Sequence, residues 1–324
     1  MTRIAAVVVT FNRKVLLKEC LDALLAQTTP LDKILLIDNA SSDGTPDFLA
    51  DGGYLRNRSI EYVRLPVNTG GAGGFYEGVK RAHLQGFDWI WIMDDDAEPK
   101  PDALETMSSS FSEEVSAVCN LVIDENNDIQ YKHRGWFDFS LPNDQIVKFI
   151  RPLDLHNGHL KIEFSSFVGL AISRSSIDRC GYPNPDFFIH YDDNEYSLRL
   201  SSVGPIVLAS RSIVIHKEAG KVERPEHIAN FMGRKSTRIP IDRLWMTYYG
   251  NRNRIWLKRQ RRGKFIGSIY AIQWAVRRCF GVLVYDDNKL RRMRFHINTL
   301  SDGLRGNFDN EKPKSLLKFP ELRN

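Results

Sequence analysis

The sequence predicts an α/β fold with a mostly parallel central sheet flanked by helices. Runs of apolar and β-branched residues alternate, over the first hundred residues, with stretches whose apolar residues recur at helical spacing. The apolar runs show no polar alternation, so we expect strands that are covered on both faces. A polar loop follows each run, at the strand end where open α/β sheets bind their ligands.

Ile4–Val9 is a continuous apolar run that predicts the first strand, and it is too short for the core of a signal peptide. Val15–Leu25 carries apolar residues at helical spacing and predicts a helix. Lys33–Ile37 predicts the second strand, and the polar turn after it leads into a short helix at Thr45–Ala50. Ile60–Leu65 predicts the third strand.

A glycine-rich run, Asn68 to Phe75, follows the third strand and precedes a predicted helix at Tyr76–Gln85. A dinucleotide-binding GxGxxG pattern that began at Gly71 would need a glycine where Tyr76 stands, and the run follows the third strand rather than the first. These two departures argue against a Rossmann dehydrogenase. The glycines let a backbone approach a sugar or phosphate closely, so Asn68, Gly70, Gly71, Gly73 and Gly74 are candidates for contacts with such a ligand. A flexible surface turn is the alternative.

Trp89–Met93 predicts a fourth, buried strand, and three carboxylates follow it at once: Asp94, Asp95 and Asp96, here named the acidic triplet. Adjacent like charges at the end of a buried strand resist ionisation. A divalent cation removes that difficulty, because Mg²⁺ and Mn²⁺ bind carboxylates together with the phosphates of a substrate. An acidic turn that caps the next helix is the alternative interpretation.

Residues 115–162 carry fewer signals, among them a predicted strand at Val118–Ile123. Trp136, with Phe137 and Phe139 nearby, is a candidate for lining an acceptor site. Aromatic clusters belong more often to a protein core, and that interpretation stays open.

Phe167–Ile172 predicts a further strand, and Asp192 and Asp193 stand just ahead of a helical pattern. Carboxylates at this position cap the first turn of a helix, and an ionised carboxylate held there also serves as a general base. Val207–Ile215 predicts a late strand that His216 closes. A histidine at a strand end is usually structural, but imidazole is also an acceptable Mn²⁺ ligand beside carboxylates.

The net charge of +5 conceals two regions of opposite sign. Residues 1–220 carry a net charge of −10 and residues 221–324 one of +15, which predicts a first domain over 1–220 and a basic, mainly helical region over 221–324. The four cysteines form no CxxC pair, which argues against a zinc site or a disulfide framework and predicts a reducing compartment.

The basic region contains an apolar segment, Phe265–Tyr285, that is about long enough to span a bilayer. Arg277 and Arg278 lie inside it, and two central charges make a spanning helix costly. We therefore expect an interfacial or packed helix whose arginine-rich flanks attract an anionic membrane surface. A solvated helical face is the alternative, and no nucleic-acid-binding module accompanies the charge.

Several motifs, taken together, resemble the inverting nucleotide-sugar transferases of glycosyltransferase family 2 over about residues 1–220. They are Val8-Val9-Thr10-Phe11-Asn12-Arg13, Ile37-Asp38-Asn39-Ala40-Ser41, Asn68 to Phe75, Asp94-Asp95-Asp96, Asp192-Asp193-Asn194-Glu195 and His216. The resemblance implies a GT-A fold and a metal-dependent hexosyltransferase that uses Mn²⁺ or Mg²⁺.

The resemblance also implies a role for each group of residues. The nucleotide would be held by Thr10, Phe11, Asn12, Arg13 and Asp38, with Asp95 beside the donor. Asp94, Asp96 and His216 would bind the metal under the diphosphate, and Asp193 would be the catalytic base. Candidate acceptor contacts are Phe164, Phe167, Asp192, Glu195 and Trp136.

The glycine-rich run that ends in Phe75 is most similar to that of bacterial galactofuranosyltransferases, which implies UDP-galactofuranose as the donor. Rhamnosyltransferases that use dTDP-rhamnose are close relatives, and the Tyr248-Tyr249…Arg252-Asn253 signature resembles both groups. One departure is that the aromatic pair that galactofuranosyltransferases often carry before the catalytic acid is here only Phe164 and Phe167.

The expected acceptor is a glycan or polyprenyl-linked glycan of cell-surface polysaccharide such as O-antigen. The expected location is the cytoplasm, peripheral to the inner face of the cell membrane. Two other classes remain open: a nucleotidyltransferase, which also uses paired carboxylates and a metal, and a relative that binds nucleotide sugars without catalysis.

Overall fold

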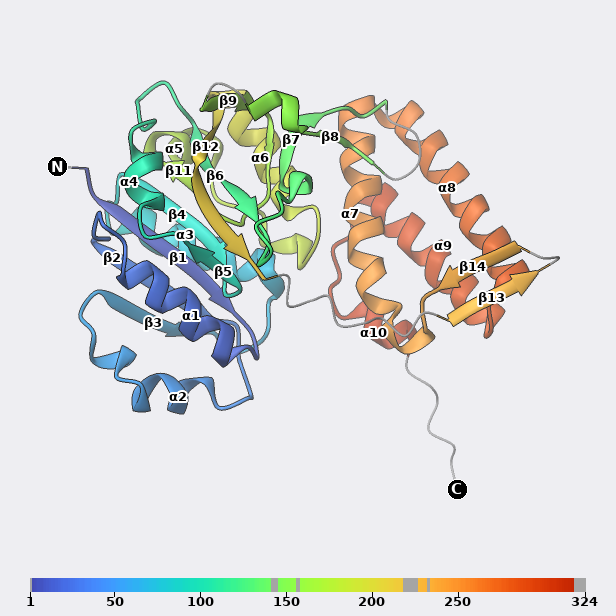
Figure 1. Ribbon diagram of the computed structural model, residues 1–324. Helices are drawn as coiled ribbons and strands as arrows, with labels where there is room; N and C mark the ends of the chain where they lie inside the picture. Colours follow the sequence, from blue (N-terminus) through green and yellow to red (C-terminus); the bar gives the residue numbers. More distant parts are fainter. Residues whose placement is uncertain (1, 141–144, 156–157, 218–226, 232–233, 318–324) are drawn as a thin grey trace. The chain divides into compact units, whose positions relative to one another are not determined.

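A computed structural model describes residues 2–140, 145–155, 158–217, 227–231 and 234–317 of the chain (Figure 1). The chain divides into two compact units. The first unit consists of residues 1–185 and 192–220, and the C-terminal unit of residues 186–191 and 221–324. The short segment 186–191 thus belongs to the C-terminal unit, although the chain on either side of it belongs to the first.

A nine-stranded mixed sheet forms the centre of the first unit (Figure 1). Its strand order is β3-β2-β1-β4-β11-β6-β12-β5, and β9 also pairs with β12. The strands are β1 (Ile4–Thr10), β2 (Lys33–Asp38), β3 (Ile60–Arg64), β4 (Trp89–Asp94), β5 (Ala97–Pro99), β6 (Ala117–Ile123), β9 (His159–Ile162), β11 (Leu170–Ser173) and β12 (Ile206–His216). The first four are mutually parallel, which confirms the predicted α/β class.

The helices of the first unit are α1 (Lys14–Leu25), α2 (Thr45–Asp51), α3 (Gly70–Leu84), α4 (Ala103–Ser108), α5 (Arg174–Cys180) and α6 (Asp192–Val203). A smaller sheet has the order β10-β7-β8, from strands β7 (Arg134–Phe137), β8 (Val147–Phe149) and β10 (Phe164–Ser165). The predicted strand at Phe167–Ile172 starts too early, because Gly169 has a left-handed φ of 71° and β11 begins only at Leu170.

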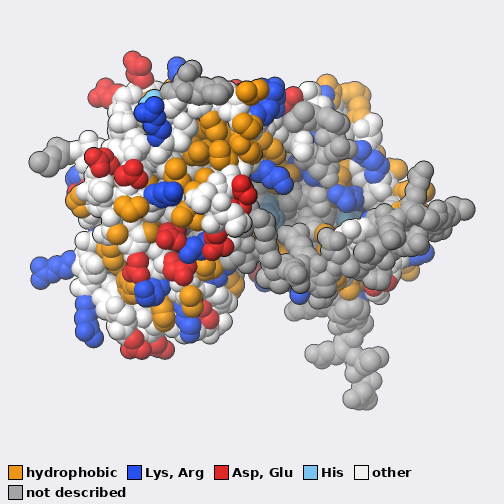
Figure 2. Space-filling view, in the orientation of Figure 1, with side chains coloured by type: hydrophobic (Ala, Val, Ile, Leu, Met, Phe, Trp, Pro, Cys, Tyr) orange, Lys and Arg blue, Asp and Glu red, His pale blue; other side chains and the backbone are white. Residues whose placement is uncertain are grey.

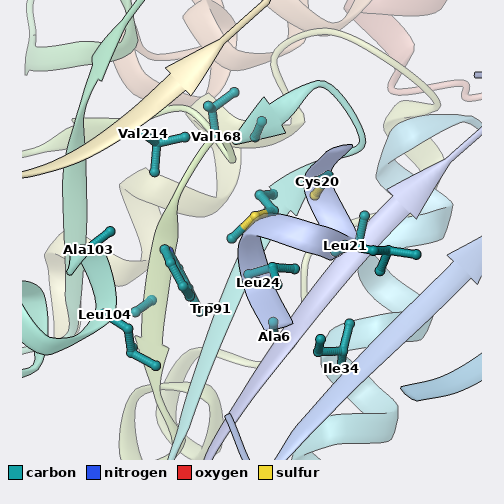
Figure 3. Close-up of a cluster of buried hydrophobic side chains, with 14 of the residues drawn as sticks. Ala6, Cys20, Leu21, Leu24, Ile34, Trp91, Ala103, Leu104, Val168 and Val214 are labelled. Atoms are coloured by element: carbon teal, nitrogen blue, oxygen red, sulfur yellow. The ribbon is translucent and has the colours of Figure 1, made fainter. Parts of the chain in front are cut away.

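Two apolar cores lie on opposite faces of the sheet, because successive strand residues point to opposite sides. Ala6 and Val8 of β1 belong to one core, while Val7 and Val9 belong to the other. In Figure 3, the side chains of Cys20, Leu21 and Leu24 from α1 lie beside Ala6, Ile34 and Trp91 of the sheet. The Trp91 indole donates to Asn120 Oδ1 at 2.9 Å, so the buried polar atom of this large side chain has a partner.

Helix α3 begins at Gly70, six residues earlier than the sequence pattern predicts, so the glycine-rich run forms its first turns. The reason is close packing of the helix on β1. A Cβ atom at Gly74 would lie 2.5 Å from Val9 Cγ1, and one at Gly78 would lie 2.3 Å from Val7 Cγ1. Glycine at these positions lets the helix axis approach the sheet more closely than any other residue would allow.

The C-terminal unit contains helices α7 (Trp245–Arg262), α8 (Lys264–Tyr285), α9 (Lys289–Arg305) and α10 (Lys312–Leu317), with a hairpin of β13 (His227–Phe231) and β14 (Arg234–Arg238). The predicted helical segment at Phe265–Tyr285 is α8. In the part of the chain that the structure describes, no helix combines the length and the apolar character that crossing a bilayer requires.

Candidate active site

The carboxyl ends of three parallel strands bring the N-terminal polar motifs to one edge of the sheet. Thr10 at the end of β1 is in register with Asp38 at the end of β2, and Val9 is in register with Asp94 at the end of β4. The strand order therefore gathers residues from three separate loops at the edge where α/β sheets bind ligands.

The turn after β2 is built on the buried carboxylate of Asp38. Its Oδ1 accepts from the backbone N–H of Ser41 at 2.8 Å, and its Oδ2 accepts from the Tyr62 hydroxyl at 2.6 Å. The Arg64 guanidinium lies 3.7 Å from Asp38 Oδ2. Tyr62 and Arg64 are on β3 and gave no motif in the sequence, so only the strand pairing reveals their part in this turn.

The loop after β1 is held against the same turn. Asn12 adopts a left-handed φ of 57°, its N–H donates to Ser41 Oγ at 3.0 Å, and its side-chain oxygen accepts from Ser42 N at 2.7 Å. Phe11 remains 41% exposed. This loop thus presents an accessible aromatic ring on a fixed backbone, as stacking on a nucleobase requires.

Asn39 ties the turn after β2 to the start of α3. Its Oδ1 accepts from the Thr69 N–H at 2.8 Å, and its Nδ2 donates to the Gly70 carbonyl at 2.8 Å. Asn68 Oδ1 in turn accepts from the Gly70 N–H. Among the predicted donor contacts here, Gly71 has open space where a Cβ would stand, whereas Gly73 and Gly74 are packed against Thr69 and Val9.

The acidic triplet lies at the end of β4, where burial raises the pKa of Asp94 and the negative charge of Asp96 raises it further. Burial likewise raises the pKa of Asp95 to about 6. Arg13 provides a positive charge, with Nη1 at 3.3 Å from Asp95 Oδ1 and 3.1 Å from Asp96 Oδ2. The Thr10 hydroxyl donates to Asp95 Oδ2 at 2.7 Å. Three adjacent carboxylates, two of them buried, beside one guanidinium leave an excess of negative charge, which a cation would compensate.

The pairing of β5 with the end of β12 brings His216 to the acidic triplet. His216 is in register with Ala97, the residue after Asp96, and its Nε2 lies 3.3 Å from Asp96 Oδ1. Its Nδ1 lies 3.1 Å from the amide oxygen of Gln130, to which it donates. That bond leaves a lone pair on Nε2, the form of the ring that binds metals. The sequence gave no signal for Gln130.

The donor set of Asp94, Asp96 and His216 fits a divalent cation in its chemistry, with hard carboxylate oxygens and one imidazole nitrogen. Among the described residues, no three His, Cys, Asp or Glu side chains converge closely enough to hold a metal ion by themselves. Mg²⁺ and Mn²⁺ sites that use one or two carboxylates are completed by substrate phosphates and water. The residues present therefore fit a cation that arrives with a phosphorylated ligand.

Asp193 lies in the first turn of α6, half-buried, while its neighbour Asp192 is buried. Burial raises the pKa of Asp193, and the negative charge of Asp94 raises it further, so the two carboxylates are within electrostatic reach of each other. The buried guanidinium of Arg134 opposes this rise. It is held by the carbonyls of Asn120 and Val168 at 2.6 to 2.9 Å, and nothing in the sequence indicated its presence.

The candidate acceptor contacts lie in different environments. Phe167 is buried, with its ring centroid 4.8 Å from that of Phe75 and 6.2 Å from that of Tyr196, and Phe164 is buried as well. Glu195 forms two short bonds with Arg199. Trp136 is half-buried and donates to the Lys161 carbonyl at 3.2 Å. Trp136 thus retains exposed surface, whereas Phe164 and Phe167 serve mainly in packing.

Comparison with known proteins gives a family for this arrangement. The model of the family described as Glycosyl transferase family 2 matches residues 5–181. A galactofuranosyltransferase, GlfT1 of Mycolicibacterium smegmatis, is 31% identical over 209 residues, 62% of this chain and 66% of that protein. GlfT1 of Mycobacterium tuberculosis is 40% identical over 92 residues, only 29% of its own length. The matches span less than two thirds of either relative.

The dTDP-rhamnosyl transferase RfbF of Shigella flexneri is 22% identical over 94% of this chain and 96% of its own. Among solved structures, GalNAc-T7 with UDP, GalNAc and Mn²⁺ superposes with a TM-score of 0.60 at 14% identity, over 96% of this chain and 58% of that one. The mannosyltransferase PcManGT of Pyrobaculum calidifontis, in complex with GDP-Man and Mn²⁺, superposes with a TM-score of 0.54 at 14% identity. The superposition covers 97% of this chain and 85% of that one.

These likenesses confirm the GT-A fold that the sequence motifs imply. The family match covers more than half of the chain and includes β1 to β4, whose ends carry Thr10, Asp38 and the acidic triplet. The protein is a member of glycosyl transferase family 2.

Proposed function

We propose that the protein transfers a sugar from a nucleotide diphosphate donor to a hydroxyl of a glycan, with inversion at the anomeric carbon. The observation that carries this proposal is the proximity of two acidic groups that lie on different elements of the first unit. The acidic triplet lies at the end of β4, with Asp95 and Asp96 buried and Asp94 half-buried, and the negative charge of Asp94 raises the pKa of Asp193 in the first turn of α6. The acidic triplet is the proposed site of the donor diphosphate, and Asp193 is the proposed partner of the acceptor hydroxyl.

The donor nucleotide is proposed to bind at the ends of β1 and β2. Phe11 offers an exposed ring for the base, and Asp38 holds the turn to which the neighbouring Asn12 is hydrogen-bonded. Thr10 and Arg13 contact Asp95, so they fix the acidic triplet next to the bound donor. The open position at Gly71, at the start of α3, lets backbone N–H groups approach an anionic or hydroxylated part of the donor.

Asp94, Asp96 and His216 would hold a Mn²⁺ or Mg²⁺ ion together with the two phosphoryl groups of the donor. A bound cation supplies Lewis-acid stabilisation of the negative charge that builds on a departing diphosphate, an effect worth several kcal/mol. The contribution of the chain is to bring two carboxylates and an imidazole to one end of the sheet, with the guanidinium of Arg13 beside Asp96. The amide oxygen of Gln130 orients the imidazole by accepting from Nδ1, which leaves Nε2 on the side of Asp96.

Asp193 is the proposed general base. It removes the proton from the acceptor hydroxyl, whose oxygen forms a bond to the anomeric carbon as the bond from that carbon to the diphosphate oxygen breaks. Attack and departure on opposite faces give inversion in one displacement. General-base assistance of this kind contributes about 10²–10⁴-fold. The raised pKa of Asp193 strengthens it as a base at neutral pH.

UDP-galactofuranose is the proposed donor, because two of the similar proteins are named as galactofuranosyltransferases, at 31% identity over 209 residues and 40% over 92. The second candidate is dTDP-rhamnose, which is favoured by the match to RfbF over nearly the whole of both chains. The proposed acceptor is a glycan or polyprenyl-linked glycan that enters a cell-surface polysaccharide.

A donor panel tests the function. UDP- and dTDP-sugars are offered with Mn²⁺ and a synthetic lipid-linked glycan, and both glycan product and released nucleotide are measured. We expect product with inverted configuration and release of UDP from UDP-galactofuranose. Product from dTDP-rhamnose alone would assign the second candidate. Release of pyrophosphate would identify a nucleotidyltransferase, and tight UDP binding without turnover on any donor would identify a non-catalytic relative, so either result contradicts the proposal.

An anionic membrane surface is the proposed partner of α8, which would place the enzyme at the inner face of the cell membrane. Exposed apolar side chains recur every three or four residues along this helix, forming a stripe of Phe265, Ile269, Ile272, Val276, Phe280 and Leu283. Residues 245–285 contain no acidic side chain, and Arg277 and Arg278 lie within the stripe's own helix. A second copy of this basic region would be repelled, whereas anionic lipid complements it.

Vesicle co-sedimentation tests this surface. We expect the protein to bind vesicles that contain phosphatidylglycerol and not vesicles of phosphatidylcholine alone. Phe280→Asp should abolish binding. Leu84→Asp, which changes an equally exposed residue on α3 of the first unit, should retain it. Unchanged binding by Phe280→Asp, or self-association that the same substitution abolishes, would contradict the assignment to lipid.

A further inference from the structure

Residues 186–191, here named the entry segment, run directly into α6 and belong to the C-terminal unit. Asp192 and Asp193 are the first two residues of α6, and they belong to the first unit. The backbone conformation of the entry segment therefore sets the direction from which the chain reaches Asp193.

Three of the six residues in the entry segment adopt a left-handed backbone conformation without being glycine. The φ angles are 63° at Phe188, 68° at His190 and 65° at Tyr191. This region costs an L-residue roughly 1–2 kcal/mol, and bulky side chains rarely occupy it. Such a conformation persists only where surrounding contacts hold it, and it is concentrated at functional sites.

Two adjacent side chains of α7 supply those contacts. Asn253 and Arg252 donate to four backbone carbonyls of the entry segment, those of Asp186, Phe187, Ile189 and His190. The shortest bonds join Asn253 Nδ2 to His190 O at 2.8 Å and to Phe187 O at 2.9 Å. The side-chain amide of Asn253 thus bridges the carbonyls of Phe187 and His190, on either side of the left-handed Phe188.

Arg252 also orients the amide of Asn253. Its Nε donates to Asn253 Oδ1 at 3.0 Å, which directs both N–H groups of the amide toward the entry segment. The guanidinium lies between the rings of Tyr249 and Phe308, at 5.3 and 4.8 Å from their centroids. Both polar side chains are fully buried, and burial lowers the pKa of Arg252 to about 10. Burying two such groups is unfavourable unless they are hydrogen-bonded.

Aromatic side chains of the C-terminal unit also pack against the entry segment. Phe187 is fully buried, with its ring 5.4 Å from that of Phe308 and 5.7 Å from that of Trp256. The ring of Phe188 stacks on Tyr249 at 4.6 Å. The Tyr249, Arg252 and Asn253 positions of the basic region thus all act on the six residues that precede the proposed base.

We propose that Arg252 and Asn253 are positioning residues of the transferase site, which hold the entry segment in its left-handed conformation and so fix where α6 presents Asp193. This inference rests on the proposed function, in which Asp193 is the base.

Asn253→Ala tests the inference through the split between turnover and donor binding. We expect kcat to fall about 10²-fold, as a displacement of about 1 Å at a reacting group produces, while the KM for donor stays within about twofold. The donor contacts proposed above lie on other elements, which the substitution does not touch. The matched control is Tyr248→Phe, on the same helix as Asn253. It removes the buried 2.5 Å hydrogen bond from the Tyr248 hydroxyl to Asp302 of α9, and this hydrogen bond does not involve the entry segment. We expect its kcat to match the wild type.

Hydrogen exchange gives a readout that does not depend on activity. Exchange at amides 187–194 should accelerate in Asn253→Ala and remain unchanged in Tyr248→Phe. If Asn253→Ala does not fold, Arg252→Lys provides the second variant, since it keeps the charge and loses the forked donors. We expect it to lower kcat with an unchanged donor KM. Equal kcat in Arg252→Lys and wild type would overturn the inference.

Asp193→Asn, measured in parallel, separates the two proposals. If Asp193→Asn retains turnover, the base assignment itself is wrong. If Asp193→Asn is inactive but Asn253→Ala has the same kcat as Tyr248→Phe, the base assignment stands and the positioning role is wrong.

Discussion

The first turn of α3 contains Gly71, a proposed donor contact. The position of this helix on the sheet depends on glycines that face β1. Replacing Gly78 with alanine would place a Cβ atom 2.3 Å from Val7 Cγ1 and 3.1 Å from Ile37 Cγ1. Both neighbours are fully buried in central strands, so neither can move aside easily. Gly71→Ala is the matched control, because nothing lies within 4 Å of the added atom.

Two opposing effects set the expected magnitude for Gly78→Ala. Overpacking a well-filled core costs about 1–3 kcal/mol, while alanine in a helix is favoured over glycine by about 0.5–1 kcal/mol. The 2.3 Å approach to Val7 Cγ1 sets the overpacking cost in the upper half of its range, so the net loss of stability is about 1–2 kcal/mol. A change of 1 kcal/mol shifts the melting temperature of a domain of this size by about 2–4 °C, so we expect a fall of about 2–8 °C. Gly71→Ala should melt at or slightly above the wild-type temperature.

Differential scanning fluorimetry of the three proteins measures this difference, and circular dichroism checks that each variant keeps its fold at low temperature. Gly78→Ala melting at or above the temperature of Gly71→Ala would refute the explanation that glycine is present for close packing. A large loss of stability in Gly71→Ala would show that its position is also constrained.

Three further outcomes follow from the site. Burial raises the pKa of Asp192 above its usual value, so ionisation of this carboxyl weakens the fold as pH rises. Asp192→Asn should therefore raise the melting temperature more at about pH 9 than at about pH 5. An equal change at both pH values would contradict this. Because Asp193 must be ionised to act as a base, kcat should fall as pH decreases, and the midpoint of the fall should lie above the ordinary aspartate pKa of 3.8. A kcat that stays level down to pH 3.8 would show that Asp193 is not the base. His216→Ala should shift the Mn²⁺ dependence of turnover at least about tenfold upward, and an unchanged titration would remove His216 from the metal site.

The sheet and its polar edge follow from local patterns in the sequence. Apolar runs such as Trp89–Met93 identify buried strands, and parallel pairing then gathers the polar residues that follow them. The start of α3 could not be located in this way, because four glycines among residues 70–74 weaken helix propensity. Only the contacts of Gly74 and Gly78 with β1 explain why a helix forms there.

The partners of the site residues were beyond sequence patterns for a different reason. Tyr62 reaches Asp38 because β3 pairs with β2, and Gln130 reaches His216 across 86 residues of chain. Arg134 is a lone arginine in a short strand, which by composition alone suggests an exposed position, yet it is fully buried. Such contacts depend on tertiary packing, which no local spacing encodes.

The basic region shows the same contrast. Its charge and apolar segment are evident from composition, and the length of Phe265–Tyr285 with two arginines inside it predicted the packed or interfacial helix that the structure has at Lys264–Tyr285. The signature that contains Arg252 and Asn253 gave a likeness to two groups of transferases but no role. That these side chains bind residues 186–191 emerges only from the structure.

The most direct test of the account compares donor binding and turnover in Asp193→Asn. The substitution keeps the size of the side chain and removes its ability to accept a proton. We predict that the dissociation constant for the nucleotide-sugar donor, measured by calorimetry with Mn²⁺, stays within about twofold, while kcat falls by about 10²–10⁴-fold. A variant that binds donor normally and still turns over at the wild-type rate would contradict the assignment of Asp193 as the base and, with it, the proposed reaction at this site.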